Sequence, residues 1–145
     1  ECLVRKAVAF RRIGGREAHV RNALQLAVSL LPQRPEAYYL MSVVYEITQD
    51  ARDEDKWQQS YAWASIGKEI DVSFKGEPLL TDVGHEGDFV FEFQQAVALW
   101  WIGRFSCAKN LFNKLLEDPC ITEHHRQAVL SNLKALSTKK KKLNT

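Results

Sequence analysis

The sequence predicts an all-α fold: an α-solenoid of about three helical hairpins followed by a C-terminal capping helix. Apolar residues recur every three or four positions over most of the chain, which is the spacing of one helix face. Gly or Pro separates these periodic segments, as expected at helix ends. The segment Phe89–Phe93 alternates like a strand, but it continues into Ala96, Leu99 and Trp100 at helical spacing, so we expect a helix there too.

The first predicted hairpin lies at the N-terminus. A helix over Leu3–Ile13 ends at Gly14 and Gly15, and a second helix runs over Glu17–Leu31 until Pro32 stops it. The apolar residues of the second helix lie three and four positions apart, which predicts one buried stripe.

The second predicted hairpin joins Pro35–Thr48 to Glu54–Ile70 through a loop at Gln49–Asp55. Pro35 fits the first helical turn, where its missing N–H costs nothing. Gly67 is expected to let the two helices approach closely, despite its low helix propensity. We expect the following side chains to face the core: Tyr38, Met41 and Tyr45 in the first helix, and Trp57, Tyr61, Ala64 and Ile66 in the second.

A long loop separates the second hairpin from the third. Periodicity disappears over residues 71–88, and this length favours a functional segment because compact domains usually use shorter connections. The third hairpin is predicted at Phe89–Ile102 and Phe105–Leu116. A final helix is predicted over Thr122–Leu136, with Thr122 as its cap.

The length of 145 residues fits one domain, and 46% hydrophobic with 26% charged residues is ordinary for a globular protein. We assign residues 1–138 to the helical domain, including the 71–88 loop, and residues 139–145 to a basic tail. Apolar runs such as Val97–Ile102 are too short to cross a bilayer, so we expect no transmembrane segment. The chain opens at Glu1 without a signal-peptide core, which suggests a fragment or a processed piece.

Cysteine use and charge give further expectations. Cys2, Cys107 and Cys120 are odd in number and widely spaced, which disfavours disulfides and metal and favours a reducing, cytoplasmic location. Cys107 lies inside a predicted helix and is expected to be a buried free thiol. Residues 1–34 carry seven basic and two acidic side chains, whereas residues 46–92 carry twelve acidic and four basic ones. The favoured explanation of this uneven charge distribution is that the charges cover solvated helix surfaces. The alternative is that they steer a charged partner.

The spacing of the third hairpin resembles a tetratricopeptide repeat. Gly103 stands in the turn, and Phe105, Ala108 and Phe112 follow at the aromatic and small positions of such a repeat. A second copy lies upstream, where Trp57, Ser60, Ala64 and Gly67 repeat the positions of Phe105, Ala108, Phe112 and Leu115. The resemblance implies stacked hairpins that present a binding surface rather than a catalytic pocket.

The order of features over Arg34–Leu136 also resembles the helical region appended to some family-2 glycosyltransferases of bacteria and large viruses. The resemblance rests on Arg34–Ala37 with Tyr45, on residues 57–70, on Pro78–Asp82 and on Phe89–Phe93. The Gly103 turn, Leu115-Leu116 and the terminal helix with Asn132 then follow in the same order. In such enzymes sugar transfer belongs to a separate nucleotide-binding α/β domain. The resemblance therefore implies a non-catalytic accessory region that positions an acceptor glycan or protein, holds a dimer, or packs against the catalytic domain.

Four motifs suggest chemistry, but a simpler explanation is favoured for each. Asp53–Asp55 has the DxD pattern of a sugar-nucleotide metal site, yet acidic residues before a helix also complement its dipole. His124-His125 with Glu123, and His85-Glu86, lack HExxH spacing. Lys139–Lys142 could bind nucleic acid or an anionic membrane, although four lysines without interleaved aromatics fit a solvated tail better. We therefore predict no catalytic, metal-binding or cofactor-binding residue and no cofactor.

The aromatic residues suggest where a partner binds. Tyr38 and Tyr39 are adjacent, as are Trp100 and Trp101, and two adjacent rings cannot both point to the buried side of a helix. One ring of each pair is therefore expected at the surface. The chain is thus expected to be a helical-repeat module that binds a protein or a neighbouring catalytic domain. The alternatives are a free-standing adaptor and a basic-tail nucleic-acid binder. The first helices of the hairpins are expected to form an inner groove, with Tyr39, Ser42 and Glu46 as candidate contacts. For an accessory region, the 71–88 loop and Trp100 or Trp101 are expected near an acceptor glycan or the catalytic domain.

Overall fold

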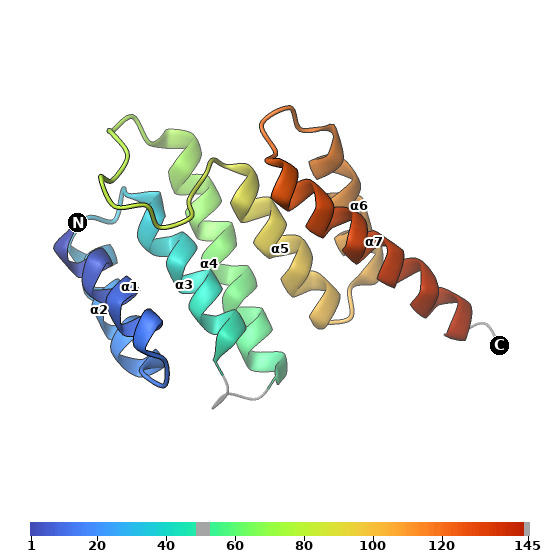
Figure 1. The fold of residues 1–145 in the computed structure, drawn as a ribbon, viewed down its shortest axis with the longest axis horizontal. Helices are drawn as coiled ribbons and strands as arrows, with labels where there is room; N and C mark the ends of the chain where they lie inside the picture. The colour runs from blue at the N-terminus through green and yellow to red at the C-terminus, as the bar shows by residue number, and fades with distance from the viewer. Residues whose placement is uncertain (49–52, 144–145) are drawn as a thin grey trace.

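The computed structural model describes the backbone of residues 1–48 and 53–143, and the side chains of residues 1–48 and 55–138. The described chain is all-helical, and its elements confirm the predicted all-α class (Figure 1). It contains seven helices: α1 (Cys2–Ile13), α2 (Glu17–Leu30), α3 (Pro35–Ile47), α4 (Asp53–Ser73), α5 (Phe89–Trp101), α6 (Phe105–Glu117) and α7 (Glu123–Leu143).

The helices pack mainly against their neighbours along the chain. Contacts join α1 to α2, α2 to α3, and so on to α7, and α3 also touches α5. As a result α1 and α2 lie at one end of the molecule and α6 and α7 at the other, with α3, α4 and α5 between them (Figure 1).

Most helix ends agree with the prediction within one residue, and three differences affect predicted segments. Helix α4 begins at Asp53, one residue before the predicted start at Glu54, so the backbone of Asp53–Asp55 belongs to the first helical turn and not to the predicted loop. At its other end α4 runs on to Ser73, which shortens the 71–88 loop to residues 74–88. Helix α7 continues past its predicted end at Leu136 to Leu143, so the backbone of Lys139–Lys142 is helical, while their side chains lie outside the described residues.

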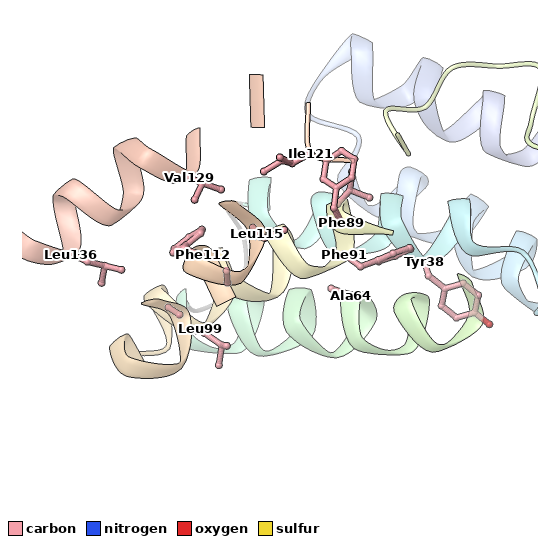
Figure 2. Packing of buried hydrophobic residues seen from close by; sticks show 13 residues of the cluster. Tyr38, Ala64, Phe89, Phe91, Leu99, Phe112, Leu115, Ile121, Val129 and Leu136 are labelled. Atoms are coloured by element: carbon pink, nitrogen blue, oxygen red, sulfur yellow. The ribbon is translucent and has the colours of Figure 1, made fainter. Parts of the chain in front are cut away.

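Most of the buried apolar side chains form two clusters. The C-terminal cluster is built mostly from α5, α6 and α7, with Tyr38 of α3 and Ala64 of α4 at its edge (Figure 2). Its buried members are Tyr38, Ala64, Phe89, Val90, Phe91, Ala96, Leu99, Ala108, Phe112, Leu115, Ile121, Val129 and Leu136. The N-terminal cluster joins α1, α2 and α3, and consists of Val4, Ala7, Val20, Ala23, Leu24, Ala37, Leu40, Met41 and Val44.

At Gly67, α4 lies close to both α3 and α5. A Cβ atom at Gly67 would overlap the ring of Phe91 and would lie 2.9 Å from Cβ of Tyr38. The prediction that Gly67 permits tight helix packing is therefore confirmed. The absence of a side chain at this position lets α4 contact two helices at once.

Two predictions of burial are wrong. Ile66 is 48% exposed, because it is one position from the buried Gly67 and so projects about 100° away from it. Cys107 is exposed, like Cys2 and Cys120, since its neighbour Ala108 occupies the buried position on α6. Trp57 and Ala64 are buried as predicted, and Tyr45 and Tyr61 are partly buried.

Candidate functional site

Two of the candidate contacts lie on one side of α3. Tyr39 and Glu46 are seven positions apart, about two helical turns, so their side chains share a face. Arg11 of α1 acts electrostatically on both residues, and the Gln94 amide of α5 donates a hydrogen bond to the Glu46 carboxylate. We call this surface, formed by Tyr39, Glu46, Arg11 and Gln94, the Tyr39 face. It combines side chains from three helices.

The Tyr39 face is partly desolvated. Burial is the main cause that raises the pKa of Glu46, and the Gln94 hydrogen bond and the charges of Arg11 and Lys56 only partly oppose it. Burial likewise raises the pKa of the Tyr39 hydroxyl. Gln94 is buried, and within the described residues its Oε1 atom has no hydrogen-bond donor. The face therefore holds polar groups whose hydrogen-bonding capacity is incompletely used.

Ser42 does not belong to this surface. Its side chain is fully buried, and its hydroxyl donates a hydrogen bond of 2.7 Å to the backbone carbonyl of Tyr39. A partner in contact with the protein surface cannot reach it. The prediction of Ser42 as a contact therefore fails on burial, because the hydroxyl is used inside the helix.

The loop between α4 and α5 lies against the helices. We call residues 74–88 the strap. From α4 the strap runs toward the α1–α2 end and returns across α3 to reach α5 (Figure 1). The Arg34 side chain holds its start, since its Nη2 atom donates a 2.8 Å hydrogen bond to the Glu77 carbonyl and its guanidinium lies 5.0 Å from the centre of the Phe74 ring.

The middle of the strap is attached to the N-terminal cluster. Leu79 and Val83 pack against the apolar side chains of α1, α2 and α3. Between them, the Thr81 hydroxyl donates a hydrogen bond of 2.9 Å to the Glu1 carboxylate. Leu80, in contrast, is 95% exposed. One side of the strap therefore packs against the protein, and the other side faces solvent.

The end of the strap covers Tyr39. Gly84 adopts a positive φ of 78°, and a Cβ at this residue would lie 3.5 Å from the Tyr39 hydroxyl oxygen. The ring centre of His85 follows at 5.9 Å from that of Tyr39 and 5.3 Å from that of Phe91. His85 Nε2 lies 3.6 Å from the Asp71 carboxylate, whose pKa is raised chiefly by burial. The end of the strap thus covers the part of the Tyr39 face that contains Tyr39 itself.

The two neighbouring histidines of α7 lie in different surroundings. His125 packs edge-on against Phe89 and Phe93, and its Nδ1 atom is 2.8 Å from the Thr122 hydroxyl. Burial lowers the pKa of His125, whereas the side chain of His124 is exposed. The described residues contain no group of three or more His, Cys, Asp or Glu side chains that could hold a metal ion. The side chains of Asp53 and Glu54 lie outside the described residues, so the DxD prediction is not tested.

The tryptophan pair lies at the other end of α5. Trp101 is 61% exposed, and its ring stacks on Trp57 of α4 at 5.4 Å with an interplanar angle of 7°. Trp100 is partly buried against the C-terminal cluster. Tyr39 touches Phe91 near the start of α5, ten positions and about 15 Å from Trp101 along the helix. The five candidate contacts therefore do not form one site.

The sequence prediction missed a charged bridge between three helices. The carboxylate of Glu92 on α5 lies 2.6 Å from Nζ of Lys68 on α4 and 2.6 Å from Nζ of Lys114 on α6. Burial is the largest effect and would raise the pKa of Glu92, but the hydrogen bonds and charges of Lys114 and Lys68 together lower it. The signal that could have found Glu92, and likewise Gln94, is a polar residue inside an otherwise apolar helix.

Two pockets accompany these features. One of about 250 Å³ lies between α1, α2 and Leu79 of the strap, and is lined mainly by apolar side chains. Another of about 400 Å³ borders Glu92, Lys114 and Pro119. Neither pocket pairs a nucleophilic side chain with a histidine.

Within the described part of the chain, no helix combines the length and the apolar character that crossing a membrane requires. No family model, curated protein or solved structure matches this chain. The site is therefore interpreted from its own geometry.

Proposed function

We propose that this chain is a non-catalytic, tetratricopeptide-like helical module that binds a protein segment through the Tyr39 face. The observation that carries the proposal is that α3 holds two half-buried polar side chains on one face, Tyr39 and Glu46, within electrostatic reach of Arg11 of α1, with the buried Gln94 of α5 next to Glu46. An aromatic hydroxyl, a carboxylate, a guanidinium and an amide can together pair with the polar backbone and side chains of a peptide. Partial burial strengthens such contacts because water competes less for the same groups.

The helix arrangement supports a solenoid. Each helix packs on the next, as expected when hairpins stack in a row. Matched positions of α4 and α6 are also buried alike: Ser60 corresponds to Ala108, Ala64 to Phe112 and Gly67 to Leu115. Phe105 departs from this pattern, since it is exposed where the corresponding Trp57 is buried.

Binding of protein partners tests the proposal directly. In a pull-down, we would compare the protein partners retained by the wild type with those retained by two variants. The first is Glu46→Arg, and in the second Lys139–Lys142 are all Ala. Reversal of the charge on the Tyr39 face is expected to reduce retention at least tenfold, whereas the tail variant keeps it. Lys109→Glu, on the exposed side of α6, is the matched charge-reversal control.

The alternatives predict other outcomes. Partners that survive Glu46→Arg in a folded protein would contradict binding through the Tyr39 face. Retention lost only in the lysine-tail variant, with a steep dependence on salt, would favour the basic-tail nucleic-acid binder.

We also propose that the module serves as the accessory region of a larger glycosyltransferase. The resemblance over Arg34–Leu136 favours this, and the exposed Trp101 stacked on Trp57 offers a flat aromatic surface suited to a sugar ring or a neighbouring domain. The full open reading frame provides the test. An adjoining nucleotide-sugar domain is expected, and a frame without one would leave the free-standing adaptor. A cytoplasmic location belongs to the same proposal.

A further inference from the structure

The strap is longer than a connection between α4 and α5 needs to be. Helices α4 and α5 pack against each other, and such neighbours are usually joined by about two to eight residues. The strap instead uses residues 74–88, fifteen positions between Ser73 and Phe89. The additional residues carry the chain to α1 and back across α3 (Figure 1). Closure of the α4–α5 turn therefore does not account for the strap.

Side chains hold the strap on the helices. Leu79 and Val83, four positions apart, enter the N-terminal cluster, and His85 contacts Tyr39 and Phe91. Arg34 and Glu1 each add one hydrogen bond, to Glu77 and Thr81. These contacts are those of an extended peptide that lies on a helical surface, with apolar anchors and polar contacts between them.

The strap backbone, in contrast, is weakly tied. In the described chain, no backbone-to-backbone hydrogen bond joins residues 75–86 to a helix. A segment attached through a few half-buried side chains opens locally at much lower cost than the helices beneath it. Another peptide with the same side chains could take its place without breaking helical hydrogen bonds.

From these contacts we infer that the strap is an internal occupant of a peptide-binding surface, formed by the Tyr39 face and the adjoining N-terminal cluster. The partner is an extended segment of another protein that carries two aliphatic side chains four positions apart, followed by an imidazole or aromatic ring. Such a segment displaces the strap and uses the same contacts. This inference rests on the proposed function and specifies its partner.

A strap peptide added in trans provides the experiment. The probe is a fluorescein-labelled peptide with the sequence of residues 77–86, EPLLTDVGHE. The receptor is the double variant Leu79→Ser with Val83→Ser, in which the strap loses both apolar anchors. We expect saturable binding at least tenfold tighter than to the wild type, whose own strap competes at a high effective concentration.

Matched controls separate specific from general binding. Leu80→Ser removes an aliphatic side chain that is already exposed, so this receptor is expected to behave as the wild type. A peptide with serine in place of both anchors is expected not to bind, and Tyr39→Ala in the released receptor is expected to weaken binding. Equal binding to wild type and released receptor, or no binding to a released receptor with full helical content, would overturn the inference.

Limited trypsin digestion of the wild type covers the case in which the released receptor does not fold. Cleavage after Lys75 in the strap is expected at least tenfold faster than cleavage after Lys68 in α4, because the strap opens without the helices. Cleavage at both sites at one common rate would contradict a displaceable strap. A partner that binds the Tyr39 face while the strap stays protected would overturn this inference and leave the proposed function in place.

Discussion

The two apolar clusters differ in how they are completed. The C-terminal cluster buries the large rings of Phe89, Phe91 and Phe112 and lies next to the Glu92 bridge. The N-terminal cluster has only aliphatic side chains in its buried core, and takes in Leu79 and Val83 from the strap. Aromatic side chains bury more surface each than aliphatic ones. The C-terminal helices thus stabilise one another, whereas the N-terminal hairpin depends on a segment from outside it.

The largest expected effect is in the C-terminal cluster. Phe112→Ala removes a fully buried ring of α6 and should lower the free energy of unfolding by about 4 kcal/mol. Urea denaturation followed by circular dichroism measures it. Phe105→Ala on the same helix is the control and should cost about 1 kcal/mol, because that ring is 37% exposed. Equal losses would show that burial on α6 does not control stability.

Leu24→Ala tests the N-terminal cluster. The side chain is fully buried on α2, and its truncation should cost about 3 kcal/mol. Hydrogen exchange should become faster in α1 and α2 while α5, α6 and α7 keep their protection. If exchange accelerates equally in all helices, the two clusters are one cooperative unit.

Gly67→Ala affects the junction of the two clusters. The added methyl group meets the Phe91 ring and Cβ of Tyr38, so overpacking should outweigh the gain in helix propensity and cost about 2 kcal/mol. Thermal and urea denaturation measure the loss. Ala62→Gly, on the exposed side of α4, is the propensity control, with an expected loss of about 1 kcal/mol. A stabilised Gly67→Ala protein would show that the helices can separate at little cost.

Glu92→Gln removes the charged bridge. Since Lys114 is mostly exposed, the loss should be limited to about 1.5 kcal/mol near neutral pH. The pKa of Glu92 is lowered in the folded state, so its contribution is present above the usual carboxyl pKa and is lost as pH falls through the folded value. The difference from wild type should therefore shrink in acid. Glu117→Gln, at an exposed position of α6, is the matched control.

Glu46→Gln should have the smallest effect and the opposite sign. Because burial raises the pKa of Glu46, the wild type is most stable below the usual carboxyl pKa and loses stability as pH rises through the folded value. The variant avoids this loss and should be more stable at neutral pH by less than about 1 kcal/mol. Denaturation from pH 4 to pH 7 measures the effect, with Glu69→Gln as the exposed control. A destabilised variant at neutral pH would show that the ionised carboxylate is favourable on the Tyr39 face.

The sequence predicted what depends on local spacing. Helix positions followed from apolar periodicity and from Gly and Pro, and Gly67 was recognised because a glycine inside a helix needs a packing reason. Ile66 and Cys107 failed because a shift of one position rotates a side chain by about 100°.

Contacts between distant segments could not be predicted in this way. Leu79 and Val83 lie within a loop without periodicity, so their spacing does not indicate which helices they touch. Glu92 pairs with lysines of two other helices. Such pairings depend on how whole helices pack, which no local pattern records. The Tyr39 face was therefore predicted only in part, through Tyr39 and Glu46.

The hydrogen bond from Thr81 to Glu1 also has a kinetic consequence, since it joins residues 80 positions apart. Most helix pairs are neighbours in the chain, so they can form through short loops on the microsecond to millisecond time scale typical of low contact order. Docking of the strap needs α1, α3 and α5 already assembled, and closes a much longer loop. We therefore expect closure of residues 74–88 to be the last event of folding and their release to be the first event of unfolding.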